Sequence, residues 1–227
     1  MELSYWISRW NKGNTGFHME NGYPGLEKHL STIHLPADSA ALVPLCGKSH
    51  DMILLSKKFE KVIGVEISEQ AITQFFEENN LNAEQFHYAG FTIFRSGKIE
   101  IWRGDFFKLP GNKIPDISLI YDKAALTALP KSMRQKYADK LKNLSGNDTT
   151  LLLHLFEYPQ EEMNGPPFSI SPGEVQNLFN EKFTVKPLEK NKLGLHNYQK
   201  FLKRGLKTYL IEYLLLLYNN QDKINQN

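Results

Sequence analysis

Short polar stretches follow several predicted strands and could bind a ligand there. These stretches are Leu45–Ser49, Glu66, Gly104–Asp105 and Asp122–Lys123. Open α/β sheets bind ligands outside the carboxyl ends of their strands, so we look for chemistry at these positions. Glu66 lies about 20 residues after the first turn, where Rossmann-type folds place an acid on ribose hydroxyls. A solvated acid at a strand end is the alternative, and the turn upstream favours the ribose.

The first turn contains one glycine, Gly47, where a dinucleotide site would have G-x-G-x-x-G. It also lacks the earlier glycine of a Walker loop. Because a pyrophosphate needs several backbone N–H groups at a glycine-rich helix start, a single glycine is a poor cradle for it. Asp105 could accept a hydrogen bond from an adenine amino group, although a simple turn residue is the alternative. A pocket that recognises adenosine but not pyrophosphate indicates S-adenosylmethionine.

Lysine, cysteine and histidine residues give weaker indications of function. Lys123 could hold an anionic acceptor, or it could form a surface salt bridge of little energetic value. Cys46 is the only cysteine, which rules out an internal disulfide and a cysteine-based zinc cluster. We interpret it as a small buried apolar residue rather than a nucleophile. The seven histidines show no metalloprotease spacing and no serine-nucleophile elbow, so we expect no metal and name no catalytic base.

The elements that position these residues alternate between strand and helix. The predicted strands are Ala40–Leu45, Lys61–Ile67, Thr92–Arg95, Ile99–Trp102, Asp116–Tyr121, Thr149–Phe156, Phe183–Leu188 and Leu206–Leu217. Helices are predicted over 2–11, 26–33, 50–58, 69–80, 134–144 and 174–180, with Ser49 and Ser68 as N-caps. This alternation predicts an α/β, Rossmann-like, doubly wound and mostly parallel sheet with an antiparallel edge.

Length and charge narrow the function classes. The chain has 227 residues, which suits one α/β domain. Its net charge of +2 gives no electrostatic footprint for nucleic acid or an anionic membrane. The late apolar stretch Tyr209–Tyr218 is shorter than the roughly 20 residues of a membrane helix. The start of the chain lacks signal-peptide features and the lone cysteine suits a reducing compartment, so we expect a cytoplasmic enzyme, by default a monomer.

Several motifs together resemble the thiopurine S-methyltransferase family, especially its bacterial members. The matching stretches occur in family order and span residues 5 to 168. They are Trp6-x-x-x-Trp10, Thr15–His18, Val43–Met52, Gly64–Ser68, Phe75–Glu78, Gly104–Phe107, Tyr121–Leu126 and Gly165–Phe168. The string Pro-Leu-Cys-Gly-Lys-Ser-x-Asp-Met that begins at Pro44 is highly specific.

The resemblance implies a class I methyltransferase that uses S-adenosylmethionine. Carried over by motif, the cofactor contacts are Trp10, Leu45, Glu66, Asp105, Phe106 and Lys123. Trp10 would be an aromatic lid over the cofactor, and the acceptor would meet Phe17, Lys123 and Phe168. The family usually has arginine where this chain has Lys123, and lysine is a point charge without arginine's planar fork.

These observations predict one domain with a helical lid at 1–35, an α/β core at 36–218 and a tail at 219–227. We expect direct in-line methyl transfer to thiopurines or similar small thiols, with selenium or tellurium compounds as further acceptors. Residues 6–18 and the loop 164–168 would close over the site. The alternatives are a cofactor-binding protein with weak turnover and a nicotinamide-dependent oxidoreductase, and the single glycine of the first turn argues against the second.

Overall fold

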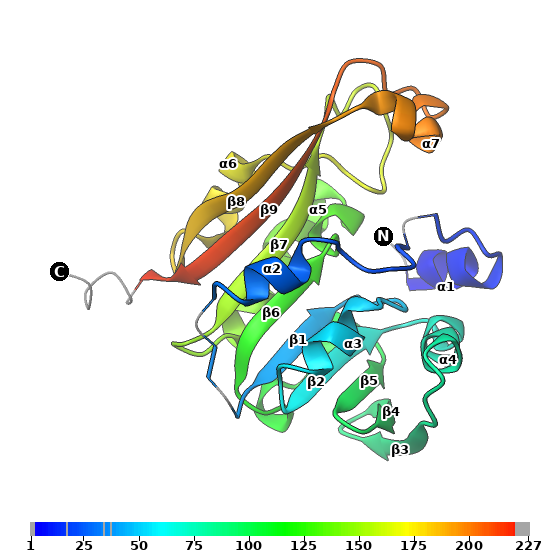
Figure 1. The fold of residues 1–227 in the computed structure, drawn as a ribbon, viewed down its shortest axis with the longest axis vertical. Coiled ribbons are helices and arrows are strands. Elements are labelled where there is room, and N and C mark those ends of the chain that lie inside the picture. The colour runs from blue at the N-terminus through cyan, green and yellow to red at the C-terminus, as the bar shows by residue number, and fades with distance from the viewer. Residues whose placement is uncertain (1–2, 17, 34, 37, 221–227) are drawn as a thin grey trace. The chain divides into compact units, whose positions relative to one another are not determined.

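The computed structural model describes residues 3–16, 18–33, 35–36 and 38–220. The chain forms two compact units, Met1–Ile120 and Tyr121–Asn227, which join within strand β6 (Ile117–Lys123) (Figure 1). The division of the chain into a lid, a core and a tail stays a prediction. Phe17 and the tail residues from 221 onward lie outside the described residues.

The first unit contains a mixed sheet with the strand order β3-β4-β5-β2-β1-β6. Besides β6, its strands are β1 (Ala40–Pro44), β2 (Lys61–Glu66), β3 (Glu84–Tyr88), β4 (Phe91–Ser96) and β5 (Ile99–Arg103). The strands β5, β2, β1 and β6 run parallel to one another, whereas β4 is antiparallel both to β5 and to β3. The helices are α1 (Leu3–Asn11), α2 (Leu26–Leu30), α3 (Asp51–Ser56) and α4 (Glu69–Glu78), with 3-10 turns η1 (Phe106–Lys108) and η2 (Gly111–Lys113).

Apolar sequence explains why these strands form the centre of the first unit. Every residue of β1 is buried, and so is every residue of β2 after Lys61. Parallel strands covered on both faces read as continuous apolar runs, which is the pattern predicted here. Helix α4 buries Ile72 and Phe75 toward this sheet, and its predicted cap is confirmed because Ser68 Oγ accepts the Ala71 N–H at 3.3 Å.

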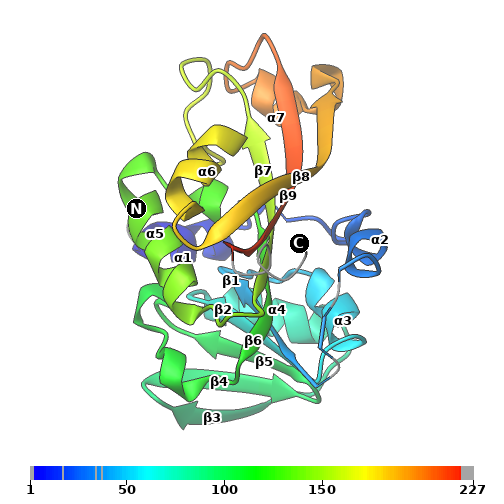
Figure 2. The ribbon, with the colours of Figure 1, turned by 90° about the vertical axis from the view of Figure 1, so that its left-hand side faces the viewer.

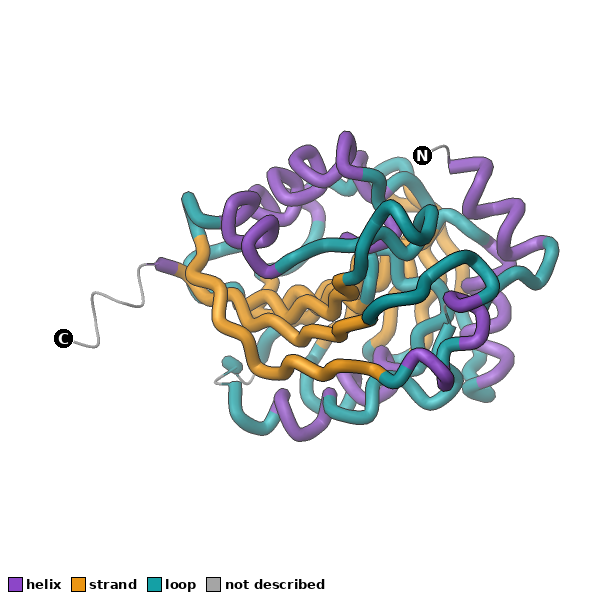
Figure 3. The backbone as a smooth tube through the Cα atoms, turned by 90° about the horizontal axis from the view of Figure 1, so that it is seen from above, coloured by secondary structure: helices purple, strands orange, loops and turns teal. Residues whose placement is uncertain are grey.

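The second unit combines three antiparallel strands with helices, and Figure 2 shows β8 beside β9. The strand order is β7-β9-β8. Its elements after β6 are η3 (Leu126–Ala128), α5 (Lys131–Leu144), β7 (Thr150–Glu157), α6 (Pro172–Phe179), β8 (Phe183–Leu193), η4 (Leu195–Asn197), α7 (Gln199–Leu202) and β9 (Leu210–Asn219). The antiparallel pairing of the late strands is confirmed. Helix α6 packs on β8. Figure 3 shows the strands of the protein in orange and its helices in purple.

Two local predictions were wrong. The N-cap position of α3 is His50 rather than Ser49, and no side chain caps that helix. Ser49 Oγ donates instead to Asp51 Oδ2 at 3.1 Å. The edge strand β3 was not predicted at all, because its residues are mostly exposed and only Phe86 and Tyr88 among them are aromatic. Within the described residues, no helix is both long and apolar enough to cross a membrane.

Candidate functional site

The carboxyl ends of β1, β2 and β5 meet at one edge of the first unit. The Cys46 N–H donates to the Val65 carbonyl at 3.0 Å, and the Gly104 N–H donates to the Glu66 carbonyl at 2.9 Å. These bonds join the turn after β1 to β2 and the turn after β5 to β2. The structure therefore gathers most of the predicted cofactor residues at one edge, namely Leu45, Glu66, Asp105 and Phe106.

The Glu66 carboxylate is the centre of this edge. It is only 5% exposed. Its Oε2 accepts the Gly47 N–H at 2.8 Å, and its Oε1 accepts the N–H groups of Ile67 at 2.7 Å and Ser68 at 2.8 Å. Burial raises the pKa of Glu66, while the three backbone donors act in the opposite direction. Since a carboxylate offers about four acceptor positions, one position remains for a ligand donor.

The turn after β1 has an unusual backbone. Leu45 has a φ of +48° and Gly47 a φ of +52°. A left-handed conformation is uncommon for a residue with a side chain and costs of order 1–3 kcal/mol, and such residues cluster at functional sites. The strain at Leu45 therefore supports a ligand-binding role for this turn.

Trp10 packs on the same turn. A Cβ added at Gly47 would lie 2.9 Å from Trp10 Cζ2, and the indole is only 2% exposed. Glycine is therefore required at position 47 for its backbone conformation and for the close approach of the ring. The structure brings the predicted lid residue to the predicted first turn, although the two are far apart in sequence.

Asp51 contributes to this turn in a way that sequence reasoning missed. Its Oδ1 accepts the Tyr23 N–H at 2.7 Å, and the backbone of Gly22 lies directly against the same oxygen. Asp51 thereby ties the segment that follows α1 to the start of α3. Asp51 belongs to the specific string that begins at Pro44, but that string does not indicate which distant group its carboxylate binds.

Asp105 and Phe106 form the turn after β5. Asp105 Oδ1 accepts the Phe107 N–H at 3.0 Å and caps η1, so the side chain has the turn role considered from sequence. Phe106 is buried and packs edge to face on Phe107 with ring centroids 6.1 Å apart. The adenine contact at this turn stays a prediction.

The Cys46 side chain is buried and cannot act as a nucleophile in this state. Burial raises the pKa of its thiol well above the ordinary value, and the charge of Glu66 adds to that effect. Its burial agrees with the interpretation as a small apolar residue. No group of three or more His, Cys, Asp or Glu side chains gathers to hold a metal ion in the part of the chain that is described.

In the second unit, Lys123 ends β6 and is partly buried. The next residue, Ala124, has a φ of +66°. Asp122 stabilises this turn, because its carboxylate accepts the Ala125 N–H at 2.6 Å and the Tyr137 hydroxyl at 2.9 Å. Burial raises the pKa of Asp122 to about 6, while the hydrogen bonds oppose the rise. Asp122 therefore shapes the backbone beside Lys123.

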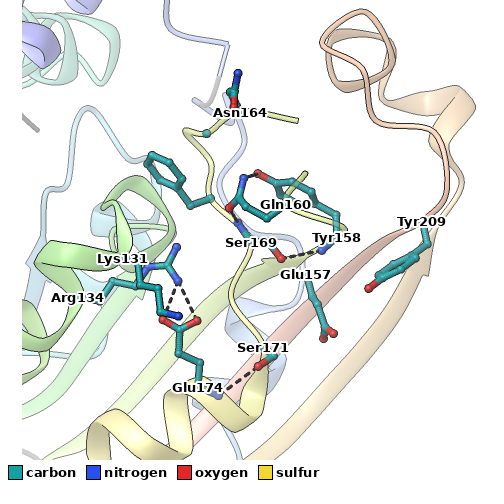
Figure 4. A pocket seen from close by; sticks show the side chains of 12 residues that line it. Lys131, Arg134, Glu157, Tyr158, Gln160, Asn164, Ser169, Ser171, Glu174 and Tyr209 are labelled. Atoms are coloured by element: carbon teal, nitrogen blue, oxygen red, sulfur yellow. Dashed lines mark hydrogen bonds and ion pairs between the residues drawn. The ribbon is translucent and has the colours of Figure 1, made fainter. Parts of the chain in front are cut away.

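A cavity of about 590 Å³ lies in the second unit, and Phe168 is one of its walls (Figure 4). Aromatic and amide side chains share the lining with charged groups from α5, α6 and β7. They include Tyr158, Gln160, Asn164, Tyr209, Lys131 and Glu157. Lys123 is not among the described residues that line this cavity. The predicted acceptor residues Lys123 and Phe168 thus occupy different places within the unit.

Comparison with known proteins identifies the family. The model of the family described as thiopurine S-methyltransferase matches residues 1–217. The chain belongs to the thiopurine S-methyltransferase family. It is accordingly an S-adenosylmethionine-dependent methyltransferase, and the nicotinamide alternative is not supported.

Curated relatives agree with this assignment over most of their length. A thiopurine S-methyltransferase of Xanthomonas axonopodis pv. citri (strain 306) is 41% identical over 190 residues, which are 84% of this chain and 87% of the relative. A thiopurine S-methyltransferase of Pseudomonas aeruginosa (strain UCBPP-PA14) is 38% identical over 217 residues, or 96% and 99% of the two chains.

Solved structures confirm the predicted fold class. A SAM-dependent methyltransferase from Anabaena variabilis ATCC 29413 has a TM-score of 0.67 at 14% identity, covering 96% of this chain and 95% of that chain. The 1,6-didemethyltoxoflavin-N1-methyltransferase of Burkholderia thailandensis, solved with S-adenosylhomocysteine, has a TM-score of 0.60 at 13% identity, covering 95% and 87%. The Rossmann-like class I methyltransferase fold is therefore shown.

The first unit fits the cofactor of this methyltransferase family. One acceptor position of Glu66 remains for a hydroxyl group, and the turn after β1 has one close-packed glycine instead of a phosphate cradle. Trp10, Leu45, Glu66 and Asp105 are the side chains and backbone that would hold an adenosine. Phe17, the remaining predicted wall, lies outside the described residues.

Proposed function

We propose that this methyltransferase transfers the methyl group of S-adenosylmethionine to the sulfur of a small aromatic thiol such as a thiopurine. The observation that carries the proposal is the arrangement of Glu66, whose carboxylate is held by three backbone N–H groups beside a strained one-glycine turn. The family assignment supports the thiol acceptor. The lining of the cavity beside Phe168, which combines aromatic rings with amide groups, suits a flat, polar heterocycle.

Each cofactor residue has a proposed role. Glu66 accepts a hydrogen bond from a ribose hydroxyl through its remaining acceptor position. At the adenine edge, the Asp105 carboxylate accepts a hydrogen bond and the Phe106 backbone N–H donates one. Leu45 contributes its backbone, which the left-handed conformation turns away from the regular strand direction. Trp10 covers the cofactor, and a sulfonium near its indole face gains roughly 0.5–2 kcal/mol from the cation–π interaction.

The proposed mechanism is an in-line displacement. The bound cofactor supplies a methyl group that is already activated by the positive charge on its sulfur. The residues of the chain must bring the acceptor sulfur into line and exclude water. A thiol that is largely ionised near neutral pH needs no strong general base, so we propose none. Phe168 with Phe17 supplies apolar walls, and Lys123, which does not line the cavity beside Phe168, favours an anionic acceptor through its charge.

A second candidate is a cofactor-binding protein with weak turnover. Lys123 favours this second candidate, because the family usually has arginine at this position and lysine lacks the planar guanidinium that can bind two acceptors. Selenium and tellurium compounds are further candidate acceptors. The cytoplasmic location and the monomeric state stay predictions from the sequence.

The test is a transfer assay with S-adenosylmethionine labelled on the methyl group. We expect label to move to 6-mercaptopurine and to other aromatic thiols faster than to aliphatic thiols or selenite. A protein that binds the cofactor by calorimetry but labels none of these acceptors would support the weak-turnover alternative. The control is Lys142→Gln, which removes the ion pairs with Asp139 and Glu181 outside both candidate sites.

A further inference from the structure

The loop 164–168, one predicted wall of the acceptor site, is fixed by groups distant in sequence. Arg204 donates from Nη1 to the Pro166 carbonyl at 2.9 Å and from Nη2 to the Asn164 carbonyl. At the end of the loop, the Phe168 N–H donates to the Thr127 carbonyl at 2.6 Å. The loop backbone is therefore held from two directions within the second unit.

The Phe168 ring is held as well. The backbone of Gly165 lies against the ring so closely that no Cβ would fit. On another side, the Arg134 guanidinium carbon is 6.0 Å from the ring centroid. Arg134 is itself fixed, because it donates to both oxygens of Glu174 at 2.7 and 2.9 Å, as the dashed lines in Figure 4 show. Gly165 and Arg134 therefore restrict the positions that the partly buried Phe168 ring can take.

Residues 205–208, which follow Arg204, contact Glu162, which comes just before the loop. Gly205 has a φ of +108°, and a Cβ there would lie 2.5 Å from the Glu162 carbonyl oxygen. The Glu162 carboxylate accepts the N–H groups of Lys207 at 2.7 Å and Thr208 at 3.1 Å. Beneath these contacts, a small buried cluster joins the two segments, consisting of Tyr158, Met163, Leu206 and Leu210.

We infer that Arg204 is a positioning residue that holds the loop 164–168 in its acceptor-binding shape before any acceptor arrives. The inference rests on the proposed function, in which Phe168 is an acceptor wall. It also replaces one part of the sequence-based mechanism, since a loop fixed by these contacts is a formed wall rather than a lid that closes.

The consequence is an effect on acceptor binding alone. If the wall is formed in only a fraction of molecules, the apparent dissociation constant rises by the inverse of that fraction. A wall that is formed in only about one molecule in ten would therefore raise the apparent dissociation constant about tenfold. We therefore expect Arg204→Gln to raise the KM for 6-mercaptopurine by about tenfold with little change in kcat. Arg204→Lys can still donate to one carbonyl, so its KM should lie between those of the wild type and Arg204→Gln.

The experiment combines kinetics with hydrogen–deuterium exchange of the peptide that spans 158–170. Exchange reports directly on the Phe168 and Ser169 amides, which donate to Thr127 and to Gln160 Oε1. We expect faster exchange there in Arg204→Gln, intermediate exchange in Arg204→Lys, and wild-type exchange in Lys142→Gln. Affinity for S-adenosylhomocysteine, measured by calorimetry, should be unchanged in all three.

The outcomes separate this inference from the proposed function. Unchanged exchange in Arg204→Gln, or faster exchange with an unchanged KM, would overturn the positioning role. A loss of cofactor affinity or a global rise in exchange would also overturn it, because the residue would then stabilise the fold in general. If the wild-type protein methylates no thiopurine while exchange rises as expected in Arg204→Gln, the proposed acceptor is wrong. The role of Arg204 in holding the loop 164–168 is then still supported.

Discussion

Replacing Glu66 with glutamine tests how the cofactor is held. The substitution keeps the shape of the side chain but removes its charge and turns one acceptor oxygen into an amide donor. At Oε1, the glutamine oxygen can still accept from Ile67 and Ser68, whose donors lie 2.7 and 2.8 Å away. At the other position, an amide nitrogen would face the Gly47 N–H, so two donors would oppose each other where a 2.8 Å bond exists now.

The expected magnitude follows from these contacts. A hydrogen bond to a charged group contributes about 1.5–3 kcal/mol, so the loss of the carboxylate at the ribose corresponds to roughly a 10- to 150-fold weaker affinity. The unmatched Gly47 donor should lower the free energy of unfolding by about 1–3 kcal/mol. Relief of the burial penalty on the charged carboxylate offsets part of that loss.

Two measurements check this reasoning. Calorimetric titration with S-adenosylhomocysteine gives the affinity, and urea unfolding gives the stability. Glu60→Gln is the matched control, because Glu60 forms an exposed ion pair with Lys98 in the same unit. A folded Glu66→Gln or Glu66→Ala protein with wild-type affinity would refute the ribose assignment.

Three further predictions concern stability and the acceptor. Asp122, with a folded pKa of about 6 against an ordinary value of 3.8, keeps its proton in the folded state at pH values where the unfolded chain has lost it. Its contribution to the free energy of unfolding should therefore fall by about 3 kcal/mol as pH rises from 4 to above 6; urea unfolding of wild type and Asp122→Asn across this range should show that difference, and a pH-independent difference would contradict it. Gly47→Ala should lower the free energy of unfolding by about 1–3 kcal/mol more than Gly97→Ala in thermal unfolding, because both glycines have positive φ but only Gly47 lies against Trp10; equal losses would show that the indole simply moves away. Lys123→Arg should lower the KM for 6-mercaptopurine by about fivefold, since a planar fork can make a second charge-assisted hydrogen bond; a higher KM would mean that lysine suits the acceptor of this protein better.

The strands and their ends were predictable because apolar runs show directly in the sequence. The turn after β1 and the acid at the end of β2 followed from strand length and chain order, and the structure places them together through the bond from Gly47 to Glu66. Their spacing alone left a solvated acid open. The motif resemblance was needed to choose between the alternatives.

Contacts between distant segments left no local signal. Nothing near Arg204 indicates that its side chain reaches the carbonyls of Asn164 and Pro166, some 40 residues earlier. The role of Asp51 is similar, since its acceptor function depends on Tyr23 arriving from a different loop. The edge strand β3 escaped prediction because its mostly exposed residues pair only with β4. Pairing and packing determine these features, and sequence periodicity does not report them.

The most direct test of the account is a crystal structure of the protein with S-adenosylhomocysteine. The account predicts a ribose hydroxyl within hydrogen-bonding distance of the Glu66 carboxylate, with the Trp10 indole over the ligand. A nucleoside bound elsewhere, or bound at this edge with the Glu66 side chain directed away from its sugar, would contradict it.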